Sequence, residues 1–245
     1  MSILVVTGTG TGVGKTVVTA GIAALALRNG QTVAVVKPGQ TGIGDGMPGD
    51  LDDIRRLAGV ETVQEHGRFP DPLAPAAAAR LARKSFVNLR ESAQRIAALD
   101  ETFDLVLVEG AGGLLVHFDD ARTSIAHLAQ SLAAPIVLVV HASLGTLNHT
   151  ELTLEAMARR ALDCRGVVIG SWPTAPGLAE RCNLRDLEDI VGEPLTGAIA
   201  EQSGELPSDR FLKSADRGLA PNLGGSFNAA SFRITYDPTP SEAAR

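Results

Sequence analysis

The sequence predicts an α/β fold of three layers, in which a mainly parallel sheet is flanked by helices. Two observations lead to this prediction. Short and continuously apolar runs, typical of strands buried on both faces, alternate along the chain with segments long enough to form helices. The first of these runs enters a glycine-rich turn that leads directly into a helix-length apolar segment, which is the arrangement of a phosphate-binding unit.

That phosphate-binding unit is the segment Gly8 to Thr16, which reads GTGTGVGKT and follows the buried strand Ile3 to Val6. Backbone N–H groups and the positive end of the next helix are expected to hold phosphates, with Lys15 adding a point charge. Thr16 would offer its hydroxyl to Mg²⁺. The spacing counted from Gly8 is one residue longer than the usual G-x-x-x-x-G-K-[ST] pattern. We nevertheless predict a P-loop NTPase-like fold that binds ATP or another nucleoside triphosphate, through Gly12, Val13, Gly14, Lys15, Thr16 and Val17.

The overall composition excludes several functional classes. The chain has 245 residues and a formal net charge of −6, so we expect no nucleic-acid partner and no attraction to an anionic membrane. The apolar run Val17 to Leu27 is shorter than the roughly 20 residues that span a bilayer, and it follows a phosphate loop. Cys164 and Cys182 match neither a metal motif nor a disulfide framework, which favours free thiols and a cytoplasmic location.

The remaining elements follow from apolar runs, capping residues and glycine or proline breaks. Further strands are expected at residues 32–37, 103–108, 136–140, 166–170 and 195–199. Helices are expected at residues 17–27, 50–59, 74–84, 88–98, 123–133, 148–162 and 178–191, with N-caps at Asp50, Asn88 and Asn148.

Two parts of the chain lack such signals. Residues 60–75 contain three prolines and are interpreted as mostly loop. Periodicity fades from about Gly204, and residues 238–245 are rich in proline and alanine. We predict a single P-loop α/β domain over residues 1–225 and a loosely ordered C-terminal tail over residues 226–245.

Polar or glycine residues close several predicted strands, namely Thr7, Lys37, Glu109 and Gly170. The carboxyl ends of strands in a doubly wound sheet lie at one edge, where ligands gather. Glu109 is therefore a candidate Mg²⁺ ligand beside Thr16, unless it is simply a solvated strand end. Asp50 is a further candidate, although Asp52 and Asp53 compete with it and its role could be that of a helix cap.

Lys37 is unusual because an ammonium group at the end of a buried strand is costly unless an anion lies near it. It would lie beside Lys15, and two like charges call for several negative charges on the ligand. The alternative is a lysine that extends to the solvent. Thr41 could hydrogen-bond the same ligand. A second possible anion site, which could instead be a plain helix start, lies at Gly145, Thr146, Leu147 and Asn148.

Four segments in series resemble the dethiobiotin synthetase family. They are G-T-G-T-G-V-G-K-T at 8–16, V-V-K-P at 35–38 with Thr41-Gly42, L-V-E-G-A-G-G at 107–113, and L-G-T-L-N-H-T-x-L-T at 144–153. The resemblance covers roughly residues 1 to 200. It implies a cytoplasmic ligase of biotin biosynthesis, a cyclo-ligase that uses ATP and Mg²⁺ to join 7,8-diaminopelargonic acid and carbon dioxide into dethiobiotin, with ADP and phosphate as the other products.

The resemblance also implies roles for individual residues. Lys37 would stabilise a carbamate and the transferring phosphoryl group, and Lys15 the β- and γ-phosphates, so these are the expected catalytic residues. Mg²⁺ would be held by Thr16, Asp50 and Glu109. Further nucleotide contacts are expected at Glu109, Gly110, Ala111, Gly112, Gly170 and Ser171.

The same family forms homodimers with the substrate site at the subunit interface. By position, the diamine would lie near Thr11, Lys37 and Thr41, and the substrate carboxylate near backbone N–H groups of the partner's Gly145 to Asn148. The segment Gly170 to Pro173 replaces a family asparagine that binds adenine, so the preferred nucleobase stays open. Trp172 within it is either a packing or a base-stacking residue.

Two other classes share a related phosphate loop. Nucleotide-switch ATPases of the partitioning or septum-positioning type carry a signature lysine five residues before the P-loop lysine, and this chain has Gly10 there. Cobyrinic-acid-type synthases are expected to carry an additional glutamine-processing domain, for which 245 residues leave no room. The resemblance to the synthetases is therefore the favoured interpretation.

Overall fold

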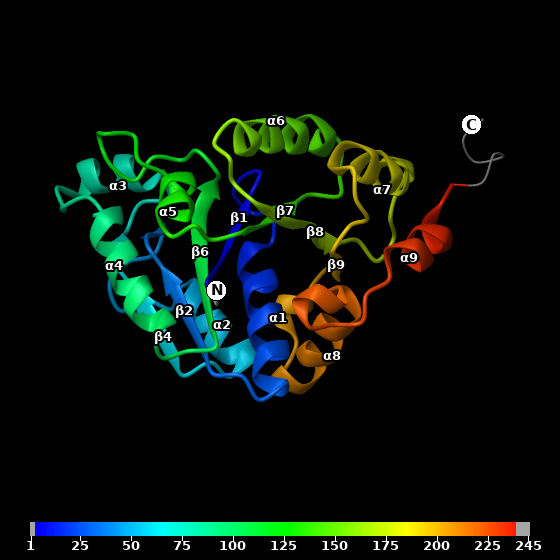
Figure 1. The fold of residues 1–245 in the computed structure, drawn as a ribbon, viewed down its shortest axis with the longest axis horizontal. Coiled ribbons are helices and arrows are strands. Elements are labelled where there is room, and N and C mark those ends of the chain that lie inside the picture. The colour runs from blue at the N-terminus through cyan, green and yellow to red at the C-terminus, as the bar shows by residue number, and fades with distance from the viewer. Residues whose placement is uncertain (1–2, 239–245) are drawn as a thin grey trace.

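The computed structural model describes residues 3–238 and contains a seven-stranded sheet, all of whose pairs are parallel (Figure 1). The strand order is β4-β2-β6-β1-β7-β8-β9. The strand bounds are β1 (Ile3–Gly8), β2 (Val33–Lys37), β4 (Thr62–Glu65), β6 (Leu105–Gly113), β7 (Ile136–Val140), β8 (Cys164–Trp172) and β9 (Gly197–Ala200). Because the strands are parallel, their carboxyl ends meet at one edge of the sheet.

Helices cover both faces of this sheet, which confirms the predicted three-layer α/β architecture (Figure 1). One face carries α1 (Lys15–Arg28), α2 (Asp50–Ala58) and α8 (Ser208–Gly218). The other carries α3 (Pro75–Ala82), α4 (Leu89–Asp100), α5 (Ile125–Ser131), α6 (Thr146–Ala158) and α7 (Leu178–Val191). The sheet therefore separates two hydrophobic clusters, as expected for strands that are apolar on both faces.

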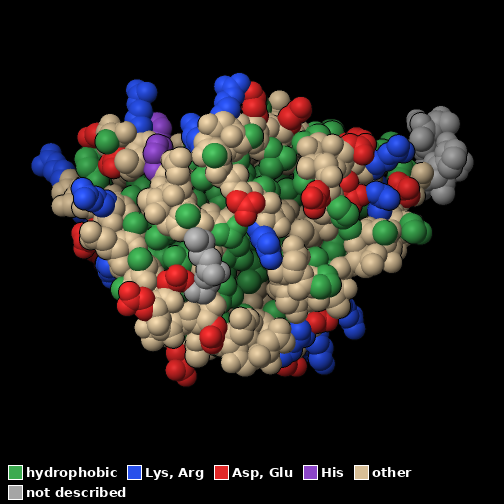
Figure 2. All heavy atoms as spheres, viewed as in Figure 1, with side chains coloured by type: hydrophobic (Ala, Val, Ile, Leu, Met, Phe, Trp, Pro, Cys, Tyr) green, Lys and Arg blue, Asp and Glu red, His purple; other side chains and the backbone are tan. Residues whose placement is uncertain are grey.

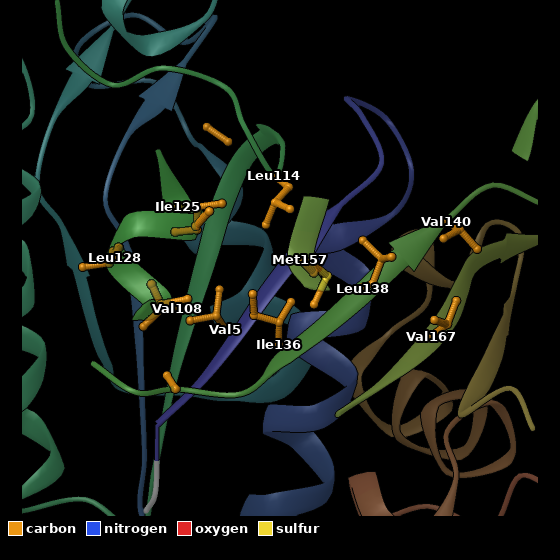
Figure 3. Close-up of a cluster of buried hydrophobic side chains, with 14 of the residues drawn as sticks. Val5, Val108, Leu114, Ile125, Leu128, Ile136, Leu138, Val140, Met157 and Val167 are labelled. Carbon is orange, nitrogen blue, oxygen red and sulfur yellow. The ribbon is translucent and has the colours of Figure 1, made fainter. Parts of the chain in front are cut away.

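The hydrophobic cluster on the face covered by α3 to α7 shows how the central strands are held. Val5 of β1 pairs in register with Val108 of β6 and Ile136 of β7, and all three side chains are buried. Figure 3 shows them in one row, with Ile125 of α5 and Met157 of α6 against the same face. Burial of such side chains contributes roughly 1.5–3 kcal/mol each. This packing makes the central strands a rigid support for the loops at their carboxyl ends.

The interpretation of residues 60–75 as mostly loop is confirmed, but the region contains two short strands that the sequence does not predict. Residues 62–65 form β4 at the edge of the sheet, paired with β2, and β5 (Arg68–Phe69) pairs with β3 (Gln40–Thr41) in a separate two-stranded sheet. Strand β4 lies at the sheet edge, and every one of its residues is only partly buried. An apolar run is not needed there, and the sequence TVQE lacks the run that marks the inner strands. The strand is stabilised by its pairing with β2, which is remote in sequence.

Two predicted N-caps are also corrected. Gly49, not Asp50, precedes α2 as its N-cap, and its N–H donates to Oδ2 of Asp52 at 2.7 Å. Helix α6 starts at Thr146 after Gly145, whose φ of 90° only glycine adopts readily, so Asn148 lies inside the first turn. Asn88 does cap α4, because its side chain accepts hydrogen bonds from the backbone N–H groups of the first turn.

The chain beyond Gly204 is more ordered than its periodicity suggests. Helix α8 has only a narrow apolar stripe, in which Phe211 and Ala215 are buried. Helix α9 (Ala229–Tyr236) packs through Phe232 and Tyr236, whose ring centroids lie 5.1 and 5.0 Å from that of Trp172. The expectation of a loose tail is therefore corrected for residues 226–236, and residues 239–245 lie outside the described part of the chain.

Charged side chains of both signs are distributed over the surface that Figure 2 displays. Figure 2 shows acidic and basic side chains interspersed around the outline of the face it displays, rather than gathered in a single patch. Within residues 3–238, none of the helices combines the length and the apolar character needed to cross a membrane.

His66, between β4 and β5, is expected to make the stability of the fold depend on pH. Burial, with a smaller effect from Arg95, lowers the pKa of His66 to about 4. Its Nδ1 lies 2.8 Å from Oγ of Ser92 and its Nε2 lies 3.3 Å from Oε1 of Gln64, which suits a neutral ring. Between pH 4 and 6.5 the unfolded chain therefore binds more protons, so the free energy of unfolding rises with pH across this window.

His66→Gln should remove most of this pH dependence. We expect the difference in unfolding free energy between pH 5 and pH 7 to shrink by on the order of 1 kcal/mol, a value reduced because the ring is partly exposed. Urea unfolding at the two pH values measures it. An unchanged difference would show that His66 titrates normally in the folded protein.

Candidate functional site

The phosphate loop connects β1 to α1 at the centre of the sheet. Gly8 still belongs to β1, which accounts for the long spacing of the motif, and the loop proper runs from Thr9 to Gly14. Gly12 and Gly14 have φ values of 76° and 95°, in a region of backbone conformation that residues with a Cβ atom rarely adopt. Helix α1 begins directly after Gly14, so its free N–H groups face the loop. This is the geometry of an anion site.

A cavity of about 820 Å³ lies beside this loop at the carboxyl edge of the sheet. It brings together most of the residues predicted for the site. Its lining includes Thr11, Gly12, Gly14, Lys15, Thr16, Val17, Lys37, Thr41, Asp50, Glu109, Ala111 and Gly112. Val13 and Gly110, also predicted, are buried next to it and are not part of its lining.

The Lys37 side chain lies at the centre of a buried charge cluster. Its ammonium group donates to Oε1 of Glu109 at 2.6 Å and forms an ion pair with Asp50. Thr16 Oγ1 donates to the same Glu109 oxygen at 3.0 Å. Lys37 is only 3% exposed, so the alternative of a lysine that extends to solvent is wrong. The three residues predicted as metal ligands thus meet around one ammonium group.

The two lysines of the cavity have different electrostatic surroundings. Burial alone would lower the pKa of Lys37, but the charges of Glu109 and Asp50 and the hydrogen bonds that Lys37 donates to both keep this pKa above its ordinary value. Burial, followed by repulsion from Lys37, lowers the pKa of Lys15 to about 8. Lys15 Nζ donates to the carbonyl of Gly10 at 2.8 Å. Two ammonium groups in one cavity favour a ligand with several negative charges.

The oxygen atoms around Lys37 also suit Mg²⁺. Glu109 is fully buried, and its Oε2 has no hydrogen-bond partner among the described residues. Mg²⁺ prefers hard oxygen ligands and typically takes one or two carboxylates, with waters and phosphates completing its coordination. Across residues 3–238 no three His, Cys, Asp or Glu side chains are grouped so that they could hold a metal. A metal at this position would therefore rely on two carboxylates, the Thr16 hydroxyl and the ligands brought by a nucleotide.

The structure separates the three aspartates that competed for this position. Asp50 reaches Lys37, whereas the carboxylate of Asp52 accepts the N–H of Gly49. Asp53 forms an exposed ion pair with Arg56 at 2.9 Å. Only Asp50 of the three is directed into the cavity.

Gly170, at the end of β8, lies against the phosphate loop. A Cβ atom on Gly170 would lie 2.0 Å from the carbonyl oxygen of Val13, so no side chain fits there. Ser171 is exposed, and neither residue lines the cavity. Trp172 is buried in edge-on contact with the rings of α9, which makes it a packing residue. A nucleotide contact at Gly170 and Ser171 stays a prediction.

Gly145 to Asn148, predicted to bind a substrate carboxylate, lie at the start of α6 and do not line the cavity of their own chain. Gly145 and Asn148 are exposed, while Thr146 is buried. The adjacent Leu144 is 84% exposed, which is unusual for a large apolar side chain. Their role stays a prediction.

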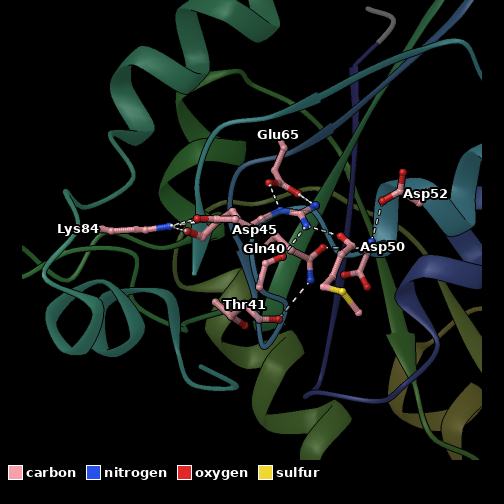
Figure 4. A network of polar contacts seen from close by, with 11 residues as sticks. Gln40, Thr41, Asp45, Asp50, Asp52, Glu65 and Lys84 are labelled. Atoms are coloured by element: carbon pink, nitrogen blue, oxygen red, sulfur yellow. Dashed lines mark hydrogen bonds and ion pairs between the residues drawn. The ribbon is translucent and has the colours of Figure 1, made fainter. Parts of the chain in front are cut away.

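Several residues near the site were not anticipated. Gln40, Glu65 and Arg68 form a polar network with the segment that leads to Asp50. Figure 4 shows this network, with Gln40, Glu65 and Asp50 labelled. Pro72 to Pro75 form another wall of the cavity. Glu65, Arg68 and Pro72 to Pro75 fall in the region 60–75 interpreted as mostly loop, and the pairing of β3 with β5 sets Arg68 beside Gln40. An arginine isolated in a predicted loop carries no sequence signal for such a role.

Comparisons with known proteins agree with these features. A family model described as an AAA domain matches residues 2–204. The ATP-dependent dethiobiotin synthetase BioD of Frankia casuarinae is 55% identical over 237 residues, which are 97% of this chain and 100% of that protein. The protein of the same name from Streptomyces coelicolor is 52% identical over 238 residues, with 97% and 100% coverage.

Solved structures show a related fold at low identity. The septum site-determining protein MinD of Pyrococcus horikoshii, complexed with Mg-ADP, has a TM-score of 0.54 and 18% identity, covering 87% of this chain and 94% of that one. The MinC:MinD complex of Aquifex aeolicus gives a TM-score of 0.54 at 14% identity, with 98% of both chains covered. At such identities the similarity concerns the architecture alone.

Proposed function

Because this chain belongs to the ATP-dependent dethiobiotin synthetase family and contains its AAA-type domain, we propose that it is a Mg²⁺-dependent cyclo-ligase that closes the ureido ring of dethiobiotin. Synthesis of dethiobiotin with ATP as co-substrate is its function, and the reaction is of the ligase type. The observation that carries the finer proposal is the cluster of the buried Lys37 and Glu109 with the partly exposed Asp50, beside the phosphate loop.

The proposed reaction has three steps. One amine of 7,8-diaminopelargonic acid adds to carbon dioxide and loses a proton, giving a carbamate. A carbamate oxygen then attacks the γ-phosphorus, and ADP leaves. The second amine attacks the carbonyl carbon of the resulting carbamic–phosphoric anhydride, and phosphate leaves as the ring closes. No step needs a covalent bond to the protein, so positioning and electrostatic stabilisation account for catalysis.

The two lysines stabilise negative charge at different points of this sequence. Lys15, at the start of α1, is placed for the β- and γ-phosphates. Lys37, at the end of β2, lines the same cavity, and there it would meet the carbamate and the transferred phosphoryl group. The pKa of Lys15 is lowered partly by repulsion from Lys37, which supports a site built for a ligand with several negative charges.

We place the Mg²⁺ between Thr16, Asp50 and Glu109. When bound, the ion neutralises charge on the phosphates. The buried and otherwise unpartnered Oε2 of Glu109, together with the Asp50 carboxylate, supports this placement. Lys37 contacts both carboxylates, so the two acidic residues that would hold the metal also fix the position of the Lys37 ammonium group.

We further propose a cytoplasmic homodimer. The exposed side chains of Leu144 and Leu152 flank the start of α6, and contact with a second subunit would bury them. In that arrangement the backbone N–H groups of Gly145 to Asn148 would bind the substrate carboxylate in the partner's cavity. The free thiols of Cys164 and Cys182 fit a reducing compartment.

A nucleotide-switch ATPase is the alternative to this proposal, since the MinD proteins share the fold. The absence of a signature lysine at Gly10 and the identity of over 50% to the synthetases favour the enzyme. Phosphate release from ATP distinguishes the two. We expect the rate to rise at least about 100-fold only when diamine and bicarbonate are both present. Equal phosphate release without either one would contradict the proposal.

A further inference from the structure

We propose that Arg68 positions the carboxylate of Asp50 for metal binding, by fastening the glycine-rich segment 42–49 that leads into α2. The inference deepens the proposed function and rests on its Mg²⁺ site. Arg68 does not line the cavity, and it acts through the backbone that carries Asp50.

The guanidinium of Arg68 contacts two parts of the chain, the glycine-rich segment and Glu65 at the end of β4. Its Nη1 donates to the carbonyl oxygens of Gly44 and Met47, at 3.2 and 2.5 Å. Its Nε and Nη2 donate to the two carboxylate oxygens of Glu65, at 2.7 and 2.9 Å. A bidentate pair of this kind fixes the plane of the guanidinium, so the remaining donor points at the segment in a defined direction.

Gln40 holds the same segment at its other end. It is 3% exposed, its Oε1 accepts the backbone N–H of Asp50 at 3.1 Å, and its Nε2 donates to the carbonyl of Thr41 at 3.2 Å. Gln40 and Arg68 are direct partners in the β3–β5 pair. A Cβ on Gly49 would lie 3.0 Å from Oε1 of Gln40 and 3.1 Å from Nη2 of Arg68. The two side chains thus enclose the residue that immediately precedes Asp50.

The segment has little else to order it. It contains glycines at 42, 44, 46 and 49, and Gly42 and Gly46 have φ values of 79° and 78°. Glycine loses more conformational freedom on ordering than any other residue. The large apolar side chain of Met47 is 62% exposed and so adds little burial. The backbone N–H of Gly42 donates to the carbonyl oxygen of Asp71 at 3.0 Å, at the start of the segment. The ion pair of Lys84 with Asp45 at 3.2 Å is exposed and therefore weak.

A specific consequence follows for the metal site. Without Arg68, the segment would have to be ordered when the metal binds, and this cost would appear as a lower metal affinity. Once metal and nucleotide are bound, Lys37 and Lys15 are unchanged, so turnover at saturating metal should be nearly preserved. If Arg68 had a merely structural role, its replacement would lower the stability of the protein without affecting metal affinity more than turnover.

The test compares Mn²⁺ binding to the complex with AMP-PCP, followed by electron paramagnetic resonance, in the full-length protein. For Arg68→Met we expect the apparent dissociation constant of Mn²⁺ to rise about 10-fold. Arg68→Lys keeps the charge but not the planar fork, so it should fall between Arg68→Met and the unchanged protein. Lys84→Met is the matched control, because it removes the exposed tether to Asp45 and a hydrogen bond to the carbonyl oxygen of Arg68 but leaves the Arg68 guanidinium contacts in place, and it should stay within about 2-fold.

Two further readouts separate the possible outcomes. Amide hydrogen exchange in residues 42–49 should be at least about 10-fold faster in Arg68→Met than in the unchanged protein. The Mg²⁺ concentration that gives half-maximal turnover should also rise in Arg68→Met, while kcat is largely retained. Asp50→Asn should weaken Mn²⁺ binding more than any Arg68 variant. If Asp50→Asn binds Mn²⁺ normally, the proposed metal site is wrong. If it loses Mn²⁺ while Arg68→Met does not, the metal site stands and the role of Arg68 is refuted.

Discussion

Lys37→Gln is expected to lower kcat of ring closure about 1,000-fold at saturating ATP, Mg²⁺, diamine and bicarbonate. The ammonium group is the charged donor placed to stabilise the carbamate and the transferred phosphoryl group, and a neutral amide provides little of that stabilisation in a buried site. The measurement is steady-state formation of dethiobiotin. Lys15→Gln should instead raise KM for ATP strongly, because Lys15 belongs to the phosphate loop itself.

The Lys37 variant needs a folding control, because Glu109 is fully buried. Removing one partner of a buried ion pair leaves an uncompensated charge, which costs about 3–5 kcal/mol. We therefore expect the melting temperature of Lys37→Gln to fall in the absence of metal and to recover partly with Mg²⁺ and nucleotide. Near-normal ring closure in Lys37→Gln, together with complete loss in Lys15→Gln, would refute the role assigned to Lys37.

Gly170→Ala is expected to raise the dissociation constant for ATP by at least about 10-fold and to destabilise the protein by about 1–3 kcal/mol. The added Cβ would lie 2.0 Å from the carbonyl oxygen of Val13 and 2.6 Å from the side chain of Val139. The first neighbour is backbone of the phosphate loop, which cannot rotate away as a side chain can. The loop must therefore move, and the N–H groups that face the phosphates move with it.

Gly10→Ala is the matched control for Gly170→Ala. Gly10 belongs to the same loop, but a Cβ there meets nothing within 4 Å, and its φ is not positive. We expect its nucleotide affinity, measured by isothermal titration calorimetry, to stay within about 2-fold of the unchanged protein. Equal losses in the two variants would mean that an added Cβ weakens nucleotide binding even where it meets no neighbour, and the packing argument for Gly170 would fail.

Much of the site could be predicted because its signals are local. The phosphate loop follows β1, Lys37 is the last residue of β2, and Glu109 follows the four apolar residues that open β6. Parallel strands bring such positions to one edge of the sheet. The edge strand β4 and helix α9 were missed for the opposite reason. Strand β4 has no apolar run, and α9 is anchored by contacts with Trp172 that lie far away in sequence.

The sequence by itself determined the three-layer α/β class, the phosphate loop and the dethiobiotin synthetase family, because these depend on contiguous motifs and on the period of apolar residues. Only the tertiary structure decided that Asp50 rather than Asp52 or Asp53 reaches Lys37, and that Arg68 lies beside Gln40. The three aspartates stand within four consecutive positions of one helical turn, and which one enters the cavity depends on the angle at which α2 leaves the glycine-rich segment. That angle is determined by packing and hydrogen bonds between residues remote in the chain, and no local pattern encodes them.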